Sequence, residues 1–142
     1  MNAFILYNSK HGTTKGYAES ISHFLDENKV ANKVAAIDNF NEEDINNADV
    51  VFLGSWTSGL FFFGQHPDKK WKDFVSSLPD MKDKQVNLFT TYKLLTGSMF
   101  RKMQESLQEK VNNHQFTFKS KSKKLTPEDI NKLNQIISAK GL

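Results

Sequence analysis

The chain of 142 residues is 38% hydrophobic and 12% aromatic, enough apolar material for a packed core, so we expect a single domain over residues 1–142 and no wholesale disorder. It has no cysteine, which excludes disulfides, thiolate zinc sites, cysteine-ligated iron–sulfur clusters and c-type haem. The formal net charge is only +3, and no apolar run approaches the roughly 20 residues that cross a bilayer, so no membrane span is expected.

The first predicted elements are a strand and a helix with a short loop between them. Ala3–Tyr7 is a continuous apolar run, which is typical of a parallel strand covered on both faces. From Tyr17 onward, apolar residues recur at i, i+4, i+7 and i+8, which predicts a helix that ends near Glu27. Residues Met1–Phe4 hold no basic region and no cleavage-like site, so no secretory signal is predicted and a cytoplasmic location is expected.

Two further strands and a short helix are predicted next. Val30–Ile37 contains an apolar stretch, and Glu42–Asn46 is predicted to be a short helix with Asn41 as its cap. Asp49–Gly54 is the clearest strand, because it is short, apolar and β-branched, and we expect its glycine to end it. The following residues, Ser55–His66, are predicted to form a loop rich in small and aromatic side chains.

The second half of the chain continues the alternation of helices and strands. Pro67 is expected at the first position of a helix that Pro79 ends. The buried stripe of this helix is predicted to be Trp71, Phe74, Val75 and Leu78. A fourth strand is predicted over Lys84–Tyr92, and a helix is expected to start at Gly97–Ser98. The stripe of that helix is predicted to be Phe100, Met103, Leu107 and Val111.

The last two predicted elements are an edge strand and a helix. Gln115–Lys119 alternates apolar and polar residues, and its lysine would discourage pairing with another sheet edge. Thr126 followed by Pro127 and an acidic third helical residue is a strong helix start. The buried residues of this helix are predicted to be Ile130, Leu133, Ile136 and Ile137.

Strands that alternate with helices predict an α/β fold with a parallel sheet covered on both faces. Five predicted strands joined by right-handed crossovers fit the order 2-1-3-4-5, with the switch point between the first and third strands. Ligands bind such sheets beyond the carboxyl ends of the strands near that point. Three loops emerge there, at Ser9–Lys15, Ser55–Gln65 and Tyr92–Thr96.

The first loop has the composition of a phosphate site. Its backbone N–H groups and those of the first helical turn converge on one point, where the helix dipole favours an anion. Ser9, Thr13 and Thr14 add hydroxyl donors, and Gly12 lets the backbone approach closely. Neither a Walker A pattern nor G-x-G-x-x-G is present. The loop resembles the [ST]-x-[ST]-G-x-T phosphate loop of the flavodoxin family and departs from it at His11, whose imidazole can still donate.

The other two loops carry aromatic side chains where a planar ligand would lie. Trp56 comes just past a strand tip, where its ring can stack on a flat heterocycle, and Tyr92 could flank the other face. Thr57 and Gly59 would let backbone groups reach the edge of that ring. The three phenylalanines Phe61–Phe63 are expected either to cover the core or to form an apolar substrate lip.

Strand order, element lengths and loops together resemble a short-chain flavodoxin-like domain, a three-layer α/β sandwich with a five-stranded parallel sheet, over nearly the whole chain. The resemblance implies FMN as the cofactor, with its phosphate in the first loop and its ring between Trp56 and Tyr92. The cofactor-binding residues that it implies are Ser9, Lys10, His11, Gly12, Thr13, Thr14, Trp56, Thr57, Ser58, Gly59, Thr91 and Tyr92. The apolar loops would disfavour an anionic reduced ring and so favour a low potential.

The resemblance implies an electron-transfer protein that passes electrons from a reductase to an oxidoreductase partner. The alternative is an oxidoreductase that acts directly on a quinone or tetrapyrrole. A signalling domain of the response-regulator kind is disfavoured, because Ser9–Lys10–His11 stands where an acidic cluster would be needed. No catalytic residue and no metal ligand is predicted, because His23, His66 and His114 are scattered without metal-like spacing.

Charge is divided unevenly along the chain, with four lysines against seven acids in residues 1–48 and fifteen basic against nine acidic residues in 49–142. The basic part is either an ordinary solvated surface or a face that steers a redox partner with an acidic docking face. Nucleic acid is not an expected partner, because the basic residues are dispersed and no reading motif occurs. The sequence leaves monomer and dimer open.

Overall fold

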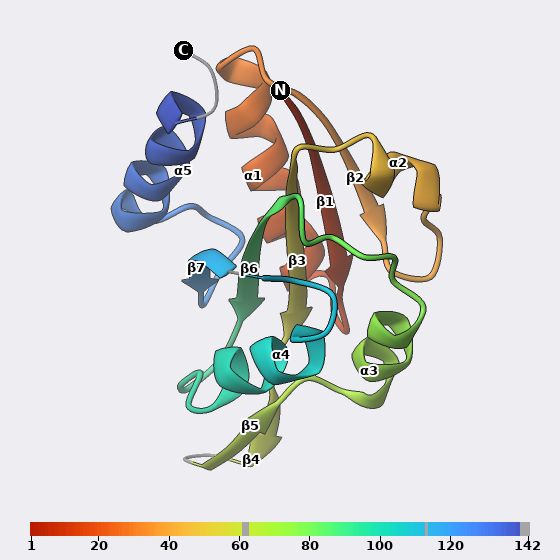
Figure 1. Ribbon diagram of the computed structural model, residues 1–142. Coiled ribbons are helices and arrows are strands. Elements are labelled where there is room, and N and C mark those ends of the chain that lie inside the picture. Colours follow the sequence, from red (N-terminus) through yellow and green to blue (C-terminus); the bar gives the residue numbers. More distant parts are fainter. Residues whose placement is uncertain (61–62, 113, 140–142) are drawn as a thin grey trace.

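A five-stranded parallel sheet forms the centre of the protein, seen in a computed structural model that describes residues 1–60, 63–112 and 114–139 (Figure 1). The strands lie in the order β2-β1-β3-β6-β7, all parallel. Their bounds are β1 Asn2–Asn8, β2 Ala31–Ala36, β3 Val50–Trp56, β6 Gln85–Thr91 and β7 His114–Ser120. Because β4 and β5 form a separate hairpin, the sheet has the predicted order 2-1-3-4-5 among its parallel strands.

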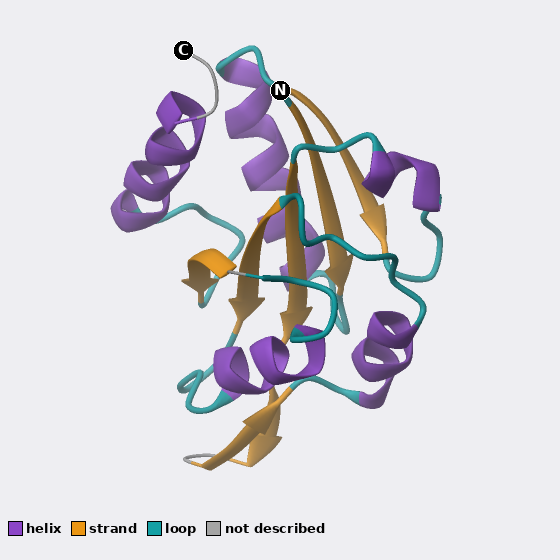
Figure 2. Cartoon of the chain, in the orientation of Figure 1, coloured by secondary structure: helices purple, strands orange, loops and turns teal. Residues whose placement is uncertain are grey.

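Helices cover both faces of the sheet, which gives the predicted three-layer sandwich (Figure 2). On one face lie α1 (Thr13–Glu27) and α5 (Pro127–Ala139), and on the other lie α2 (Glu42–Asn46), α3 (Lys69–Ser76) and α4 (Met99–Leu107). No helix within the described residues is both long enough and apolar enough to cross a membrane.

Each face of the sheet buries its own hydrophobic cluster. In β1, Phe4 and Leu6 pack toward α3 and α4, whereas Ala3 and Ile5 pack toward α1 and α5. Both sets are almost completely buried, which explains why the strand is a continuous apolar run instead of an alternating one. The predicted stripe of α3 is buried in full, and in α4 only Phe100 is partly exposed.

Gly54 does not end β3, contrary to the prediction, because the strand continues to Trp56. The glycine is needed for packing within the strand. A Cβ at this position would lie 2.1 Å from the Phe89 ring, which covers the backbone of the neighbouring strand. Glycine therefore marks a close approach of an aromatic ring here and not a strand end.

The segment predicted as one loop, Ser55–His66, is largely β-structure. After β3, the chain forms an antiparallel hairpin of β4 (Ser58–Leu60) and β5 (Phe63–His66), which projects beyond the carboxyl ends of the sheet (Figure 1). Residues 61 and 62 and the side chain of Phe63 lie outside what is described, so the two predicted roles of these phenylalanines stay predictions.

Side chains close in sequence cap the starts of α2 and α3. Asn41 caps α2 as predicted, and its Oδ1 accepts the Glu43 N–H at 3.0 Å. The prediction for Pro67 is wrong: α3 begins at Lys69, and Asp68 is the cap that accepts the Trp71 N–H at 3.0 Å. A proline that precedes the cap fixes the incoming chain without entering the helix.

The start of α5 holds a buried acid that the sequence prediction missed. Thr126 and Asp129 cap each other, with bonds of 2.9 and 3.1 Å, as the motif predicts. Asp129 is only 2% exposed and accepts the Tyr17 hydroxyl at 2.7 Å, whereas Ile130 is 38% exposed instead of buried as predicted. Burial, with the bond to Asp129, raises the pKa of Tyr17 far above its ordinary value, so its phenol stays a donor.

Candidate functional site

A cavity of about 690 Å³ lies at the carboxyl ends of β1, β3 and β6, where the three predicted loops meet. Nine of the twelve predicted binding residues line it: Lys10, His11, Thr13, Thr14, Trp56, Thr57, Ser58, Thr91 and Tyr92. Five further lining residues were not among the predicted binding residues: Gln65, Lys93, Leu94 and Leu95, which lie in the predicted second and third loops, and Lys121, which lies outside them. Of the remaining predicted residues, Ser9 and Gly12 shape the first loop, and Gly59 lies in β4.

The first loop presents the start of α1 to the cavity. Gly12 has a φ of +92°, in the left-handed region, and Ser9 Oγ accepts its N–H at 3.0 Å. No described side chain caps α1, unlike α2 and α3. The N–H groups of its first turn therefore lack a side-chain acceptor, and an anion in the cavity can serve as one.

A hydroxyl pair joins the first loop to the end of β6. The Oγ1 atoms of Thr14 and Thr91 lie 2.6 Å apart, and both residues are buried. Only one of the two hydroxyls donates in this bond, so the other retains a hydrogen for a further acceptor. Thr14 thus orders the site and can also contribute a donor through the pair.

Asp68 fixes the indole of Trp56, a role that the sequence prediction missed. Its Oδ2 accepts the Trp56 Nε1–H at 3.0 Å, and its Oδ1 accepts the Asn8 side-chain amide at 2.7 Å and the Trp71 N–H at 3.0 Å. One carboxylate thereby holds the second loop, the end of β1 and the start of α3. From sequence alone it was noticed only as part of a helix start.

We expect Asp68→Ala to lower the free energy of unfolding by about 2–3 kcal/mol, since the helix cap and the partners of two side chains are lost together. Urea denaturation measures this loss. The control is Asp73→Ala on the same helix, which removes only an exposed ion pair with Lys69 and should cost less than about 1 kcal/mol. Equal losses in the two variants would contradict the role given to Asp68.

Hydrogen bonds also hold the second and third loops together. The Thr57 N–H donates to the Thr91 carbonyl at 2.9 Å, and the Oγ1 atoms of Thr57 and Thr90 lie 2.7 Å apart. The Tyr92 N–H donates to the Ser120 carbonyl at 3.2 Å, which places its ring beside the end of β7. Trp56 and Tyr92 thus enter the cavity lining from the ends of two adjacent strands, β3 and β6.

Two lysines lie over these aromatic rings. Lys10 Nζ is 4.7 Å from the centroid of the Trp56 ring, and Lys121 Nζ is 5.7 Å from that of Tyr92. Lys121 belongs to the basic part of the chain, residues 49–142, which the sequence left as either a solvated surface or a docking face. Lys121 follows β7, and the pairing of β7 with β6 brings it to the cavity. The predicted strand order placed these two strands side by side, but the residues after β7 were not among the three loops expected at the site.

The residues of this cavity fit a phosphorylated planar ligand. An uncapped helix start and a positive-φ glycine suit a phosphate, while Trp56 and Tyr92 suit a flat ring. Within the described part of the chain, no three His, Asp or Glu residues gather as metal ligands would.

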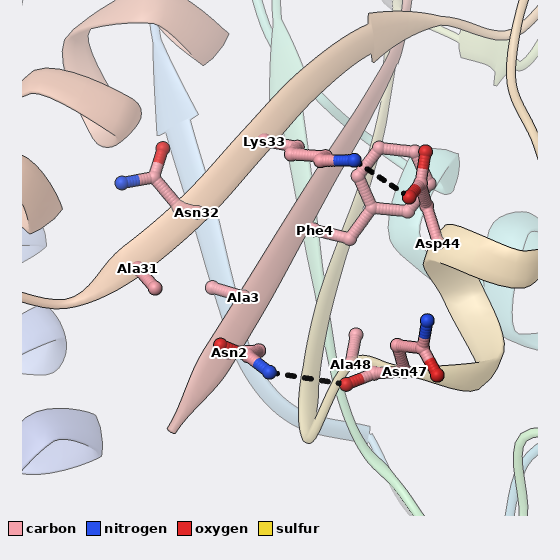
Figure 3. A pocket seen from close by; sticks show the side chains of 9 residues that line it. All are labelled: Asn2, Ala3, Phe4, Ala31, Asn32, Lys33, Asp44, Asn47 and Ala48. Atoms are coloured by element: carbon pink, nitrogen blue, oxygen red, sulfur yellow. Dashed lines mark hydrogen bonds and ion pairs between the residues drawn. The ribbon is translucent and has the colours of Figure 1, made fainter.

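A second pocket, of about 280 Å³, lies at the amino ends of β1 and β2 (Figure 3). Lys33 and Asp44 form an ion pair of 2.9 Å across it, and the Asn2 side chain donates to the Asn47 carbonyl at 3.4 Å. These groups already bind one another and join β1, β2 and α2. The pocket is therefore explained by the contacts of the fold.

The fold and this cavity define the class: a doubly wound α/β protein with a ligand site at its switch point. The chain belongs to the flavodoxin domain family, since the family model described as "Flavodoxin domain" matches residues 4–120. Membership implies a flavin cofactor, typically FMN. No curated protein sequence matches the chain.

Solved structures confirm the fold. The chain is similar to two-electron reduced Megasphaera elsdenii flavodoxin, with a TM-score of 0.74, 17% identity, and coverage of 96% of this chain and 98% of that one. It is also similar to oxidised Flavodoxin 2 from Bacillus cereus, with a TM-score of 0.71, 23% identity, and coverage of 98% of this chain and 97% of that one. For the Flv1 flavodiiron core from Synechocystis the TM-score is 0.66 with 15% identity, and the match spans 99% of this chain but 37% of that one.

Proposed function

We propose that the protein binds FMN and carries electrons from a reductase to an oxidoreductase partner. One observation carries the proposal: a single cavity joins the uncapped start of α1 to the rings of Trp56 and Tyr92. Such a cavity offers both a phosphate subsite and a stacking subsite. When bound, FMN supplies reversible uptake of electrons, and the protein supplies its position and surroundings.

The proposed roles of the residues follow from their places in the cavity. The first-turn N–H groups of α1, with His11, Thr13 and the Thr14–Thr91 pair, would hold the phosphate. Trp56, oriented by Asp68, would fix the plane of the ring, and Ser58 would lie at its edge. Enclosing the ring between aromatic side chains removes water from its faces.

We further propose that residues 1–142 act as one cytoplasmic domain and that the partner is a redox protein with an acidic docking face. Exposed lysines at the cavity, with Leu94 53% exposed beside them, support a basic docking surface with an apolar centre. The likeness to part of a flavodiiron protein supports a redox-protein partner.

The test compares FMN with riboflavin, which has the same ring and lacks the phosphate. We expect the purified protein to turn yellow with FMN, to quench its fluorescence, and to bind it at least about 100-fold more tightly than riboflavin, because several charge-assisted bonds are made to the phosphate. Protein that stays colourless in excess FMN, or that binds both flavins equally, would contradict the proposal.

The alternative of direct action on a quinone or tetrapyrrole depends on a substrate lip at Phe61–Phe63. Residues 61 and 62 and the Phe63 side chain lie outside the described structure, so no observation favours that activity over electron transfer. Turnover of a quinone by the FMN-loaded protein without a second protein distinguishes the two, since a carrier alone should show none at a useful rate.

A further inference from the structure

The rim of the candidate cavity is positively charged. Lys10, Lys93 and Lys121 line it, and no aspartate or glutamate does so among the residues that the structure describes. The nearby carboxylate of Asp68 bonds to Trp56 but is occupied by three donors. A ligand that becomes more negative as it reacts would therefore be held more tightly after the reaction than before it.

Two of these lysines reach the aromatic end of the cavity from different elements. Lys10 comes from the first loop and lies over the ring of Trp56, with 4.7 Å from Nζ to the ring centroid. Lys121 follows β7 and lies over the ring of Tyr92, at 5.7 Å. Each ammonium group is held beside a ring that the proposed function assigns to flavin binding.

We propose that Lys10 and Lys121 stabilise the anionic reduced form of the bound flavin and thereby raise its reduction potential, an inference that rests on the proposed function. On reduction, the neutral ring of a bound flavin would gain two electrons from a reductant and one proton from solvent, which leaves one net negative charge on the ring. A nearby ammonium group stabilises this charged product and leaves the neutral reactant almost unaffected. The effect opposes the desolvation by the apolar loops, which disfavours the same charge.

The experiment measures the midpoint potential and the dissociation constant of oxidised FMN for Lys10→Gln, Lys121→Gln and the double variant. Dithionite is the reductant, with a reference dye. The binding preference is the ratio of the dissociation constants of oxidised and reduced FMN. We expect each single variant to reduce this ratio by about 3- to 10-fold, which lowers the two-electron potential by about 15–30 mV. The control is Lys82→Gln, which removes the same charge from an exposed site before β6, at the opposite edge of the sheet, and should leave the potential unchanged.

The outcomes separate the two proposals. A lysine variant that weakens the binding of both redox forms equally, with an unchanged potential, would show a contact to the phosphate and overturn this inference. Unchanged affinity and unchanged potential would also overturn it, while FMN binding by the wild type would still support the proposed function. A wild-type protein that takes up no FMN would overturn the proposed function, and this inference with it.

Discussion

Gly12→Val is expected to lower the affinity for FMN by at least about 100-fold. Gly12 has a φ of +92°, and a β-branched residue there costs about 1–3 kcal/mol, so the loop would leave the conformation that presents the start of α1. No atom of the described residues lies within 4 Å of the position that a Cβ would take, so we expect the effect to come from the backbone and not from a clash. Fluorescence titration with FMN measures the loss.

A matched variant distinguishes a specific effect of the first loop on FMN affinity from a general effect of backbone strain on stability. Gly64 in β5 has a φ of +75° and is exposed, and its Cβ position likewise has no atom within 4 Å in the part of the chain that the structure describes. Gly64→Val should therefore reduce the free energy of unfolding about as much as Gly12→Val does, without a comparable loss of FMN affinity. Similar affinity losses in both variants, or none in Gly12→Val, would remove the basis for a phosphate site in the first loop.

The largest expected effect on stability belongs to Gly54→Ala, which should lower the free energy of unfolding by about 3 kcal/mol or more. The added Cβ would lie 2.1–2.3 Å from three carbon atoms of the Phe89 ring, and both residues are fully buried, so the strands or the ring must move. Urea denaturation, followed by circular dichroism, measures the change.

Two further variants test the cause. In Gly16→Ala the three atoms nearest to the new Cβ, at 2.4–3.1 Å, belong to the exposed side chain of Lys123, which can give way more easily than a buried ring, so a smaller loss than in Gly54→Ala is expected. Phe89→Leu should partly rescue Gly54→Ala, because the shorter side chain leaves room, and the double variant should be more stable than the sum of the single losses predicts. Strict additivity would show that the ring is not the reason for the glycine.

Local patterns were sufficient for most of the fold. The apolar run Ala3–Tyr7, the cap at Asn41 and the reciprocal cap of Thr126 with Asp129 each depend on residues close in sequence, and all were predicted. The order of the sheet followed from strand–helix alternation, and the meeting of the three loops followed from that order.

Several errors share a physical cause, which is contact between residues far apart in the sequence, whereas the cap at Asp68 and the β4–β5 hairpin were missed although both are local. The prediction that Gly54 ends a strand failed because the Phe89 ring that covers Gly54 lies 35 residues later in the chain. Lys121 was missed although β7 was correctly expected beside β6, because the residues after β7 were not counted among the loops at the site. The prediction that Ile130 is buried failed because its neighbour Asp129 takes the buried position instead. Asp129 is held there by the hydroxyl of Tyr17, 112 residues earlier in the chain. Composition cannot indicate such partners.

The three bonds of Asp68 also bear on protein engineering. Moving the Trp56 loop alone onto another parallel-sheet scaffold would leave the indole without its acceptor, and the ring would be free to turn. A working transplant must bring the first turn of α3 and the asparagine at the end of β1 with it. The smallest portable unit is therefore discontinuous in sequence, drawn from three separate stretches of the chain.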